Sequence, residues 1–531
     1  MHARNRCSAL VGPFRLVLFT VFSAINTTYP SNTMSDTVEK TAVSATTTTP
    51  TEKQPALQPL DASSATTLQE EQPVRQKWYQ WFSPSDTPEE RRLILKLDLL
   101  ILVFVFLAYW AKVLDQSALS AAYVSGMRED LHLFGNELNY LNTAYMVGYI
   151  TLQVPLTLLM TRLSASWCIP AADVLWGVLT LAQYRVNSVG PLYAVRFLIG
   201  AAGSLFFPAV QWYLGCWYTR AEAGRRGALF FVASQVGAMS AGYIQSGAYA
   251  SLHLRAGIEG WRWLYIICFA CTIPVAVLGF VCLPGLPEAP RLTFLTAREA
   301  ALARARMRRD RTEPRRPLTW AAARRTLAGW HFWVLVGFAF FFSQADGVSA
   351  NSGLPLWLKA EGYGVAAINT ITTVSPAVTI AAALVCGVLS DAHADAKVPL
   401  IAATAVLNAL AAAVLAVWRV PAGLTLAAFF LAGSANGVAP VVYAWANEVC
   451  AGDAEERALV LSSMNTVGNA FGAWLPLFVW KTTDAPRYRI GYAWAVGVDG
   501  GVLVMVFVLR SFWNREQAAR GAGGGRRGNG E

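Results

Sequence analysis

The chain has 531 residues, of which 55% are hydrophobic and 14% are charged, and its mean hydropathy is +0.38. A soluble protein carries about 25% charged residues, so this composition predicts a membrane protein. The formal net charge is +10. A nucleic-acid-binding protein would need a soluble basic face, for which the apolar stretches leave little room.

The amino-terminal residues 1–90 predict a disordered cytoplasmic tail. Residues 8–25 resemble a weak signal peptide, but Arg15 interrupts their apolar core and no clear small-x-small cleavage site follows. From Met34 onward the tail is rich in Ser, Thr and Pro and cannot bury enough apolar surface to fold. We therefore hypothesise that translation starts at Met34.

Twelve apolar stretches follow the tail. A helix needs about 20 mainly apolar residues to cross a hydrocarbon core of about 30 Å. The stretches are centred near residues 108, 150, 178, 203, 238, 273, 341, 379, 408, 433, 468 and 502. We expect an all-α membrane protein with two six-helix bundles, residues 91–283 and 330–512, joined by a long central loop, residues 284–329.

The central loop and the carboxy-terminal tail, residues 513–531, are rich in Arg. Thr296 and Glu299 form a capping box, which predicts that a basic surface helix starts in the loop. If both termini are cytoplasmic, the cytoplasmic loops hold far more Arg and Lys than the opposite loops. This bias predicts that orientation.

Several kinds of chemistry lack their usual residues. The five His residues lie in tails, loops or span ends, whereas a metal transporter or a membrane oxygenase would place them on facing spans. The sequence holds no G-x-x-x-x-G-K-[ST] loop, which argues against an ATP-driven pump. Cys268 and Cys271 form a lone C-x-x-C pair in an apolar stretch, and we interpret them as packing residues. We expect no enzyme activity, no metal and no cofactor.

Charged side chains inside the spans call for a functional explanation. Each costs several kcal/mol in a bilayer and usually faces a water-filled cavity or a partner. In the first span, Lys112 and Asp115 are three residues apart, share a helix face and can neutralise each other. Lys112 near a span end could instead extend to the membrane interface. The deeper charges, Asp115, Asp173 in the third span and Arg196 in the fourth, favour a functional role.

Polar residues of other spans are further candidates for a binding cavity. Asp346 in the seventh span lies near the depth of Asp115 in the first, as expected where a transporter builds its site between two related halves. Asn351 follows it closely. Gln235 in the fifth span and Asn465 in the eleventh are candidate lining residues. For each uncharged residue, hydrogen bonding between helices is at least as good an interpretation.

Five stretches of the sequence resemble one family. They are residues 112–139, 196–226, 257–267, 439–450 and 479–488. They are similar to the fungal anion:cation symporters, the allantoate permease group of the major facilitator superfamily, and most similar to its pantothenate and biotin permeases. The resemblance runs from about residue 91 to residue 515. It implies twelve helices in two bundles, alternating access, and proton-coupled uptake of a small organic anion at the plasma membrane.

The resemblance also implies roles for individual residues. Asp115 matches the first-span Asp that the family uses in proton coupling, and Asp173 matches an acidic position in the third span. Arg196 matches the fourth-span Arg that serves substrate-carboxylate binding or proton relay. Lys112 is a second candidate cation for the substrate. Protonation of Asp115 would then release a cation for the anion, with the proton as the coupling ion.

The sequence departs from the family pattern at two places. Lys112-x-x-Asp115-Gln116 stands where the family often has Asn-x-x-Asp-Arg, so the cation lies on the other side of Asp115. Gly203 stands where the family commonly has Glu. The second departure argues against a relay of two carboxylates and leaves Asp115 or Asp173 as the proton site.

These observations predict a monomeric secondary transporter in the lipid bilayer, with no nucleic-acid partner. The expected substrate is a small carboxylate such as pantothenate. Biotin, nicotinate, allantoate or a sulfur-containing acid would suit the same fold. A nutrient sensor that does not transport is the alternative from a different class.

Overall fold

In the computed structural model we describe residues 81–82, 86–162, 164–287, 289–291, 294–310, 320–450 and 453–525. The proposed start at Met34 and most of the predicted disordered tail lie outside these residues. The described residues form helices together with one antiparallel pair of two-residue strands in the central loop. The predicted all-α class is therefore confirmed.

The amino-terminal half begins at a capping box. The backbone N–H of Thr87 donates to Glu90 Oε2 at 2.8 Å, and Pro88 occupies the first turn, where its missing N–H costs nothing. The helices of this half are α2 (Pro88–Leu97), α3 (Val103–Ala122), α4 (Arg128–Asp130), α5 (Glu137–Arg162), α6 (Ala165–Ala182), α7 (Val189–Gly203), α8 (Phe206–Trp217), α9 (Arg220–Leu252) and α10 (Gly260–Cys282).

The central loop contains two strands and two helices before the carboxy-terminal half begins. They are β1 (Gly285–Leu286), β2 (Ala289–Pro290), α11 (Ala297–Asp310) and α12 (Trp320–Ala328). The predicted capping box is confirmed, because the backbone N–H of Thr296 donates to Glu299 Oε2 at 2.8 Å and that of Glu299 donates to Thr296 Oγ1 at 3.2 Å.

The carboxy-terminal half contains a broken helix at its start. The helix α13 ends at Ala345, and the chain continues through two shorter helices, α14 and α15, which are separated by Asn351 and Ser352, and the φ of Ser352 is +57°. The helices of this half are α13 (Trp330–Ala345), α14 (Gly347–Ala350), α15 (Gly353–Ala360), α16 (Val365–Ile371), α17 (Val374–Ala392), α18 (Lys397–Val417), α19 (Ala422–Ala432), α20 (Ala439–Val449), α21 (Ala454–Trp474), α22 (Pro476–Val479) and α23 (Arg489–Gly525).

The last helix is longer than predicted. We placed the end of the twelfth span at residue 512, but α23 continues to Gly525. The first part of the added segment, residues 513–520, contains Arg, Glu, Gln and Ala, which are good helix formers in water as well as in a membrane, whereas four of the last five residues are Gly. Helix propensity therefore extends the helix beyond its apolar part.

Each predicted span coincides with a helical stretch. Among the described residues, nine helical stretches are long and apolar enough to cross a bilayer, and α13 is a shorter apolar helix. The helices α5 and α21, of 26 and 21 residues, are not in that set. They come from opposite halves and contact each other, and the Thr143 hydroxyl donates to the Ala473 carbonyl at 2.8 Å. Polar side chains on these two helices can therefore avoid lipid.

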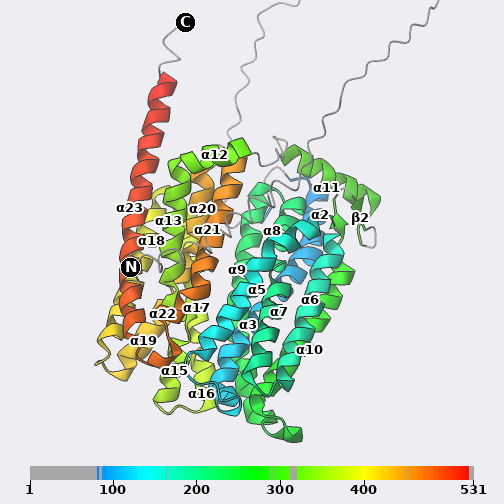
Figure 1. Ribbon diagram of the computed structural model, residues 1–531. Coiled ribbons are helices and arrows are strands. Elements are labelled where there is room, and N and C mark those ends of the chain that lie inside the picture. The colour runs from blue at the N-terminus through cyan, green and yellow to red at the C-terminus, as the bar shows by residue number, and fades with distance from the viewer. Residues whose placement is uncertain are drawn as a thin grey trace, which may run out of the picture. The chain divides into compact units, whose positions relative to one another are not determined.

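The two halves are tied together at one end of the bundle, which we call the α15 end because α15, α16 and α22 lie there (Figure 1). Asn139 Nδ2 donates to the Trp480 carbonyl at 2.6 Å, and Lys359 pairs with Glu129 at 2.8 Å. One apolar core at this end includes buried residues of both halves, such as Trp261 and Trp357.

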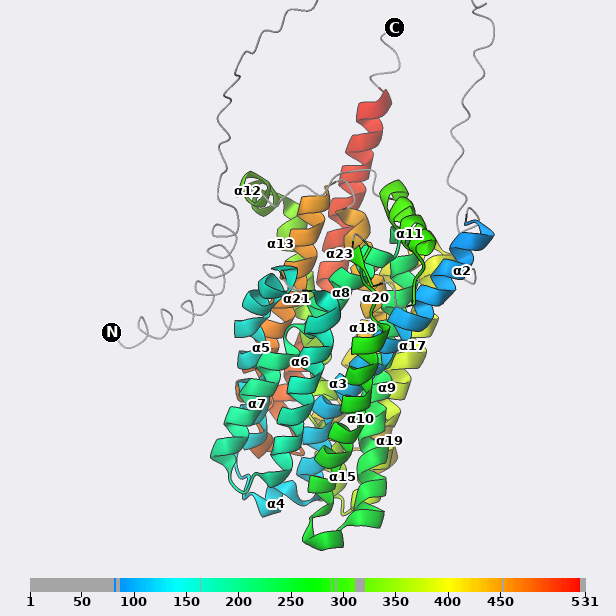
Figure 2. The ribbon, with the colours of Figure 1, turned by 90° about the vertical axis from the view of Figure 1, so that its right-hand side faces the viewer.

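The opposite end, which we call the α11 end, carries α2, α11 and α12 (Figures 1 and 2). Here α11 forms ion pairs with the amino-terminal half, Glu299 with Lys96 and Arg306 with Glu222. Arg325 of α12 pairs instead with Asp453, at the start of α21. Asp453 Oδ1 also caps α21, accepting from the backbone N–H of Glu455 at 2.9 Å. Each loop helix is thus attached to the half that adjoins it in sequence.

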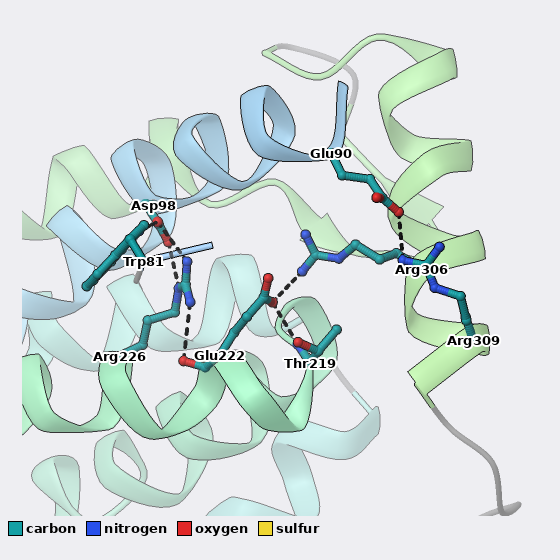
Figure 3. A network of polar contacts seen from close by, with 8 residues as sticks. All are labelled: Trp81, Glu90, Asp98, Thr219, Glu222, Arg226, Arg306 and Arg309. Atoms are coloured by element: carbon teal, nitrogen blue, oxygen red, sulfur yellow. Dashed lines mark hydrogen bonds and ion pairs between the residues drawn. The ribbon is translucent and has the colours of Figure 1, made fainter. Parts of the chain in front are cut away.

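A network of buried charges attaches α11 (Figure 3). Arg306 donates to Glu222 Oε2 at 2.5 Å, and these side chains are only 2% and 3% exposed. Glu222 also accepts from the backbone N–H of Thr219 at 3.0 Å and so caps α9. Beside it, Arg226 donates to both carboxylate oxygens of Asp98 at 2.7 and 2.8 Å. The bidentate geometry makes this a strong pair.

The backbones of α5 and α7 meet at two glycines. A Cβ at Gly200 would lie 2.0 Å from the Tyr145 carbonyl oxygen, and one at Gly148 would lie 2.1 Å from the Phe197 carbonyl oxygen. Only glycine permits this approach, as in other close helix pairs within membranes. The contact brings α7 close to α5 and sets the position of Arg196.

Candidate functional site

Four predicted site residues come together inside the amino-terminal half. Lys112 and Asp115 lie on α3, Asp173 on α6 and Arg196 on α7, and all four side chains are at most 5% exposed. Four ionisable groups buried in one bundle must balance one another, since an isolated buried charge is strongly unfavourable. The site therefore depends on how these charges are paired.

Asp115 accepts hydrogen bonds on one oxygen only. Trp176 Nε1 and Thr180 Oγ1 of α6 donate to Asp115 Oδ2, the second at 3.2 Å, and the thiol of Cys268 lies against the same carboxylate. Asp115 Oδ1 has no hydrogen-bond partner among the described residues. The cation that acts electrostatically on this carboxylate is the Arg196 guanidinium.

We expected that Lys112 and Asp115 could neutralise each other, but other groups surround the Lys112 ammonium. Its ammonium donates to the Gly203 carbonyl and lies 5.2–5.3 Å from the ring centroids of Tyr149, Trp176 and Phe206. The carboxylate that acts on it electrostatically is Asp173. Sharing a helix face with Asp115 was not sufficient for pairing, because α5, α6, α7 and α8 supply the groups that surround the ammonium.

The structure gives Gly203 a specific role. A Cβ at this position would lie 3.5 Å from Lys112 Nζ and 3.7 Å from the Tyr145 hydroxyl. A side chain at 203 would therefore point toward the ammonium. In this chain the backbone carbonyl takes that place, and the nearby carboxylate is Asp173 on another helix.

Arg196 retains free donors. Its Nε and Nη2 atoms are buried and have no hydrogen-bond partner among the described residues. The Tyr265 hydroxyl of α10 lies against the same guanidinium. An arginine presents its N–H groups as a planar fork that matches a carboxylate. Two unused N–H groups beside Asp115 are thus suited to bind an anion.

A small void lies beside Lys112 and Asp115, and Arg196 and Asp173 are not among the residues that line it. It offers about 10 Å³ to the centre of a water-sized sphere, which is room for about one water molecule. The residues that line it are Lys112, Asp115, Gln116, Tyr145, Trp176, Ile199 and Gly203. An organic substrate would need this region to open.

The remaining predicted residues do not form part of the charge cluster in this arrangement. Gln235 on α9 donates to the Ser234 hydroxyl at 3.4 Å, and Asn351 donates to the Gly347 carbonyl at 2.7 Å, within the broken segment after α13. Asp346 accepts a weak hydrogen bond from Asn436 at 3.5 Å. Asn465 is half-buried on α21, the helix that contacts α5 of the other half.

Sequence reasoning missed a buried acid in the carboxy-terminal half. Asp499 on α23 is completely buried and accepts from Asn408 Nδ2 of α18 at 2.9 and 3.1 Å. The same amide donates to the Ala345 carbonyl, where α13 ends, at 2.9 Å. A single Asp in the middle of an apolar span was the signal that could have identified it.

Sequence reasoning also missed Trp176 and Thr180. With Asp173 they lie at successive positions three and four residues apart, so all three share one face of α6. That spacing was available from the sequence. It could not show that this face points at Asp115.

No cluster of three or more His, Cys, Asp or Glu side chains suited to a metal ion occurs among the residues described here. The four buried charges of the site lie inside one bundle of apolar helices, an arrangement that suits the movement of an ion across a membrane. A multi-pass fold of two halves around such charges defines a membrane transporter.

Comparison with known proteins gives the family. The model of the Major Facilitator Superfamily matches residues 105–476. The vitamin H transporter of Saccharomyces cerevisiae is 31% identical over 462 residues, covering 85% of this chain and 77% of that relative. The pantothenate transporter liz1 of Schizosaccharomyces pombe is 32% identical over 417 residues, covering 78% of this chain and 81% of that relative. The chain belongs to the Major Facilitator Superfamily.

A solved structure confirms the fold. The crystal structure of a D-xylose-proton symporter superposes with a TM-score of 0.57 at 14% sequence identity, covering 77% of this chain and 96% of that one. This superposition and the family match confirm the predicted major facilitator fold. The sequence matches to the vitamin H and pantothenate transporters confirm the resemblance to pantothenate and biotin permeases.

Proposed function

We propose that the chain takes up a small organic carboxylate of the vitamin class, such as pantothenate or biotin, together with protons. The relatives described above carry the names of these vitamins. The observation that carries the proposal is the buried Arg196, whose Nε and Nη2 have no hydrogen-bond partner among the described residues. A carboxylate can accept from two such N–H groups at once.

Asp115 is the proposed proton site. Its carboxylate acts on Arg196, so it competes with a substrate carboxylate for the same guanidinium. Its unpartnered Oδ1 is open to a proton. When Asp115 is protonated, Arg196 loses its internal counter-charge and the substrate carboxylate replaces it. Proton and anion then travel together.

Lys112 and Asp173 form the second charge pair of the site. The Lys112 ammonium already has the Gly203 carbonyl and three aromatic rings as neighbours. It is therefore a poorer first contact for the substrate than Arg196. Asp173, whose Oδ2 lacks a partner among the described residues, is the alternative proton site.

Substrate access requires movement of the two halves. The void at the site has room for about one water, and the halves are tied at the α15 end by Asn139 and Lys359. We place the α11 end on the cytoplasmic side of the plasma membrane, and we expect both termini on that side as well. The described state is then closed to the outside, and alternating access would open the α15 end. We expect the unit to be a monomer.

Uptake of radiolabelled pantothenate in a permease-deficient yeast tests the proposal. Arg196→Lys keeps the positive charge but removes the fork of donors, so we expect uptake to fall at least about tenfold. Asp115→Asn should leave uptake insensitive to external pH. Arg185→Lys, at an exposed position on the α6–α7 connection, is the matched control and should transport normally.

Competition with unlabelled biotin, nicotinate, allantoate and a sulfur-containing acid identifies the substrate. The labelled form of the strongest competitor then replaces pantothenate in the assay. Normal uptake by the Arg196→Lys variant would remove Arg196 from the substrate site. Wild-type protein that reaches the surface but moves none of these acids would contradict the transport proposal and favour a sensor.

A further inference from the structure

One aromatic side chain contacts both charge pairs. The edge of Trp176 donates its indole N–H to Asp115 Oδ2, while its ring centroid lies 5.3 Å from Lys112 Nζ. The side chain is 3% exposed. Because an indole is rigid, its edge and its face cannot move independently. A change at Asp115 must therefore be felt at Lys112.

We propose that Trp176 is a positioning residue that links protonation of Asp115 to the release of the Lys112 ammonium. The proposal rests on the proposed function, since it takes Asp115 as the group that accepts the transported proton. Trp176 itself neither titrates nor binds the substrate. Its role is to determine when Lys112 becomes available.

The ionised state of Asp115 holds the ring in place. A hydrogen bond to a carboxylate is roughly twice as strong as one between neutral groups. The second donor to the same oxygen, Thr180, comes from the next turn of α6. With the indole held, its face stays over the ammonium, which also donates to the Gly203 carbonyl. Lys112 is then occupied and does not attract an anion.

Protonation of Asp115 weakens this hold. The proton adds to the carboxylate and no other bond breaks, so the indole N–H now meets a neutral acid. The ring is freer to turn, and the cation loses part of its attraction to the ring face. Lys112 can then join Arg196 in binding the substrate carboxylate. The order is proton first and anion second.

Several other titratable or charged groups lie around Asp115. They are Lys112 on α3, Tyr145 on α5, Asp173 on α6, Arg196 on α7, and Tyr265, Cys268 and Cys271 on α10. The neighbouring α9 meets α3 through Ser240 and Gly237, which do not titrate. Among the contacts described, Trp176 is the side chain that touches both Asp115 and Lys112.

The test compares two donors to the same oxygen. Trp176→Phe keeps an aromatic face but removes the N–H donor. Thr180→Val removes the hydroxyl donor and keeps the size of the side chain, and Thr180 has no described contact with Lys112. Both variants should move the pH midpoint of uptake upward, because each removes a hydrogen bond to the ionised carboxylate. Surface expression is measured for each variant with a carboxy-terminal tag.

Double-mutant cycles with Lys112→Met then separate the role of Trp176 from that of Thr180. For Trp176→Phe combined with Lys112→Met, we expect the shift in the pH midpoint to differ from the sum of the two single shifts by roughly threefold or more in proton concentration. For Thr180→Val combined with Lys112→Met, the two single shifts should add. If Lys112→Met abolishes uptake, Lys112→Gln, which also removes the cation, takes its place. If Trp176→Phe does not reach the surface, Trp176→Tyr replaces it.

The outcomes are distinct. An unchanged pH profile in Trp176→Phe, or equal coupling of Lys112 to Trp176 and to Thr180, overturns the role of Trp176 while leaving proton-coupled transport intact. Absence of pH-dependent uptake in the wild-type protein would instead contradict the proposed function itself.

Discussion

Of the ion pairs that join α11 to the amino-terminal half, Arg306 with Glu222 is the one in which both described side chains are buried (Figure 3). Removing one member of a buried pair costs about 3–5 kcal/mol, because the other charge stays buried without compensation. The upper part of this range applies here. Arg306 Nε and Nη1 have no partner among the described residues, so Glu222 is the group that compensates its burial.

We expect Arg306→Met to make α11 detach far more often. At about 1.4 kcal/mol per tenfold, a loss of 3–5 kcal/mol raises the population of detached helix roughly 100-fold to 4,000-fold. Amide hydrogen exchange of α11 in the purified protein measures this directly, because local opening limits the exchange of buried amides.

Arg298→Gln is the matched control on the same helix. Its pair with Glu89 is largely exposed, at 81% and 61%. Exposed pairs contribute about 0–1 kcal/mol, so exchange should rise no more than roughly fivefold. The double variant Glu222→Gln with Arg306→Met removes both charges and should recover much of the protection.

Two results would refute this reasoning. One is exchange in Arg306→Met within fivefold of the wild-type rate. The other is a double variant that exchanges as fast as the faster of the two single variants. Either would show that apolar packing of α11, rather than the ion pair, holds it in place.

Two further predictions concern helix contacts. Gly200→Ala should prevent α5 and α7 from packing and give little monodisperse protein on size exclusion. Gly190→Ala is the control and should be tolerated, because no described atom lies within 4 Å of the new Cβ. Equal recovery of the two variants would contradict the close contact between α5 and α7. Burial tends to raise the pKa of Asp453, but backbone N–H groups at the start of α21 and the Arg325 guanidinium hold that pKa below its ordinary value. Its contribution is therefore complete above about pH 3.9 and is lost as the pH falls through the lower folded value. The difference in thermal unfolding midpoint between wild type and Asp453→Ala should be constant at pH 5–7 and shrink only below about pH 4; a difference that already changes between pH 5 and 7 would contradict the assignment.

The positions of the helices could be predicted from the sequence because apolar length is a local property. The spans, the capping box of Thr296 and the presence of buried charge near Asp115 and Arg196 all followed from short stretches of sequence. The detailed bounds were harder. The helix α13 breaks before the end of its apolar segment, and α23 continues past the end of its own, since helix propensity and hydropathy are separate properties.

The candidate site was predicted in part. Lys112, Asp115, Asp173 and Arg196 were identified as intramembrane charges, and the structure gathers them in one cluster. Trp176 was missed because an indole in an apolar helix looks like a packing residue until its neighbours are known.

The sequence by itself determined that this is a membrane protein of two helical halves with charges inside its spans. Local composition and hydropathy are enough for that. Only the tertiary structure decided the surroundings of each charge: the Lys112 ammonium donates to the Gly203 carbonyl and is acted on electrostatically by Asp173 rather than pairing with Asp115. Spacing along one helix defines which residues share a face, but the partner on that face comes from helices distant in the sequence. Packing of α6 and α7 against α3 makes that choice.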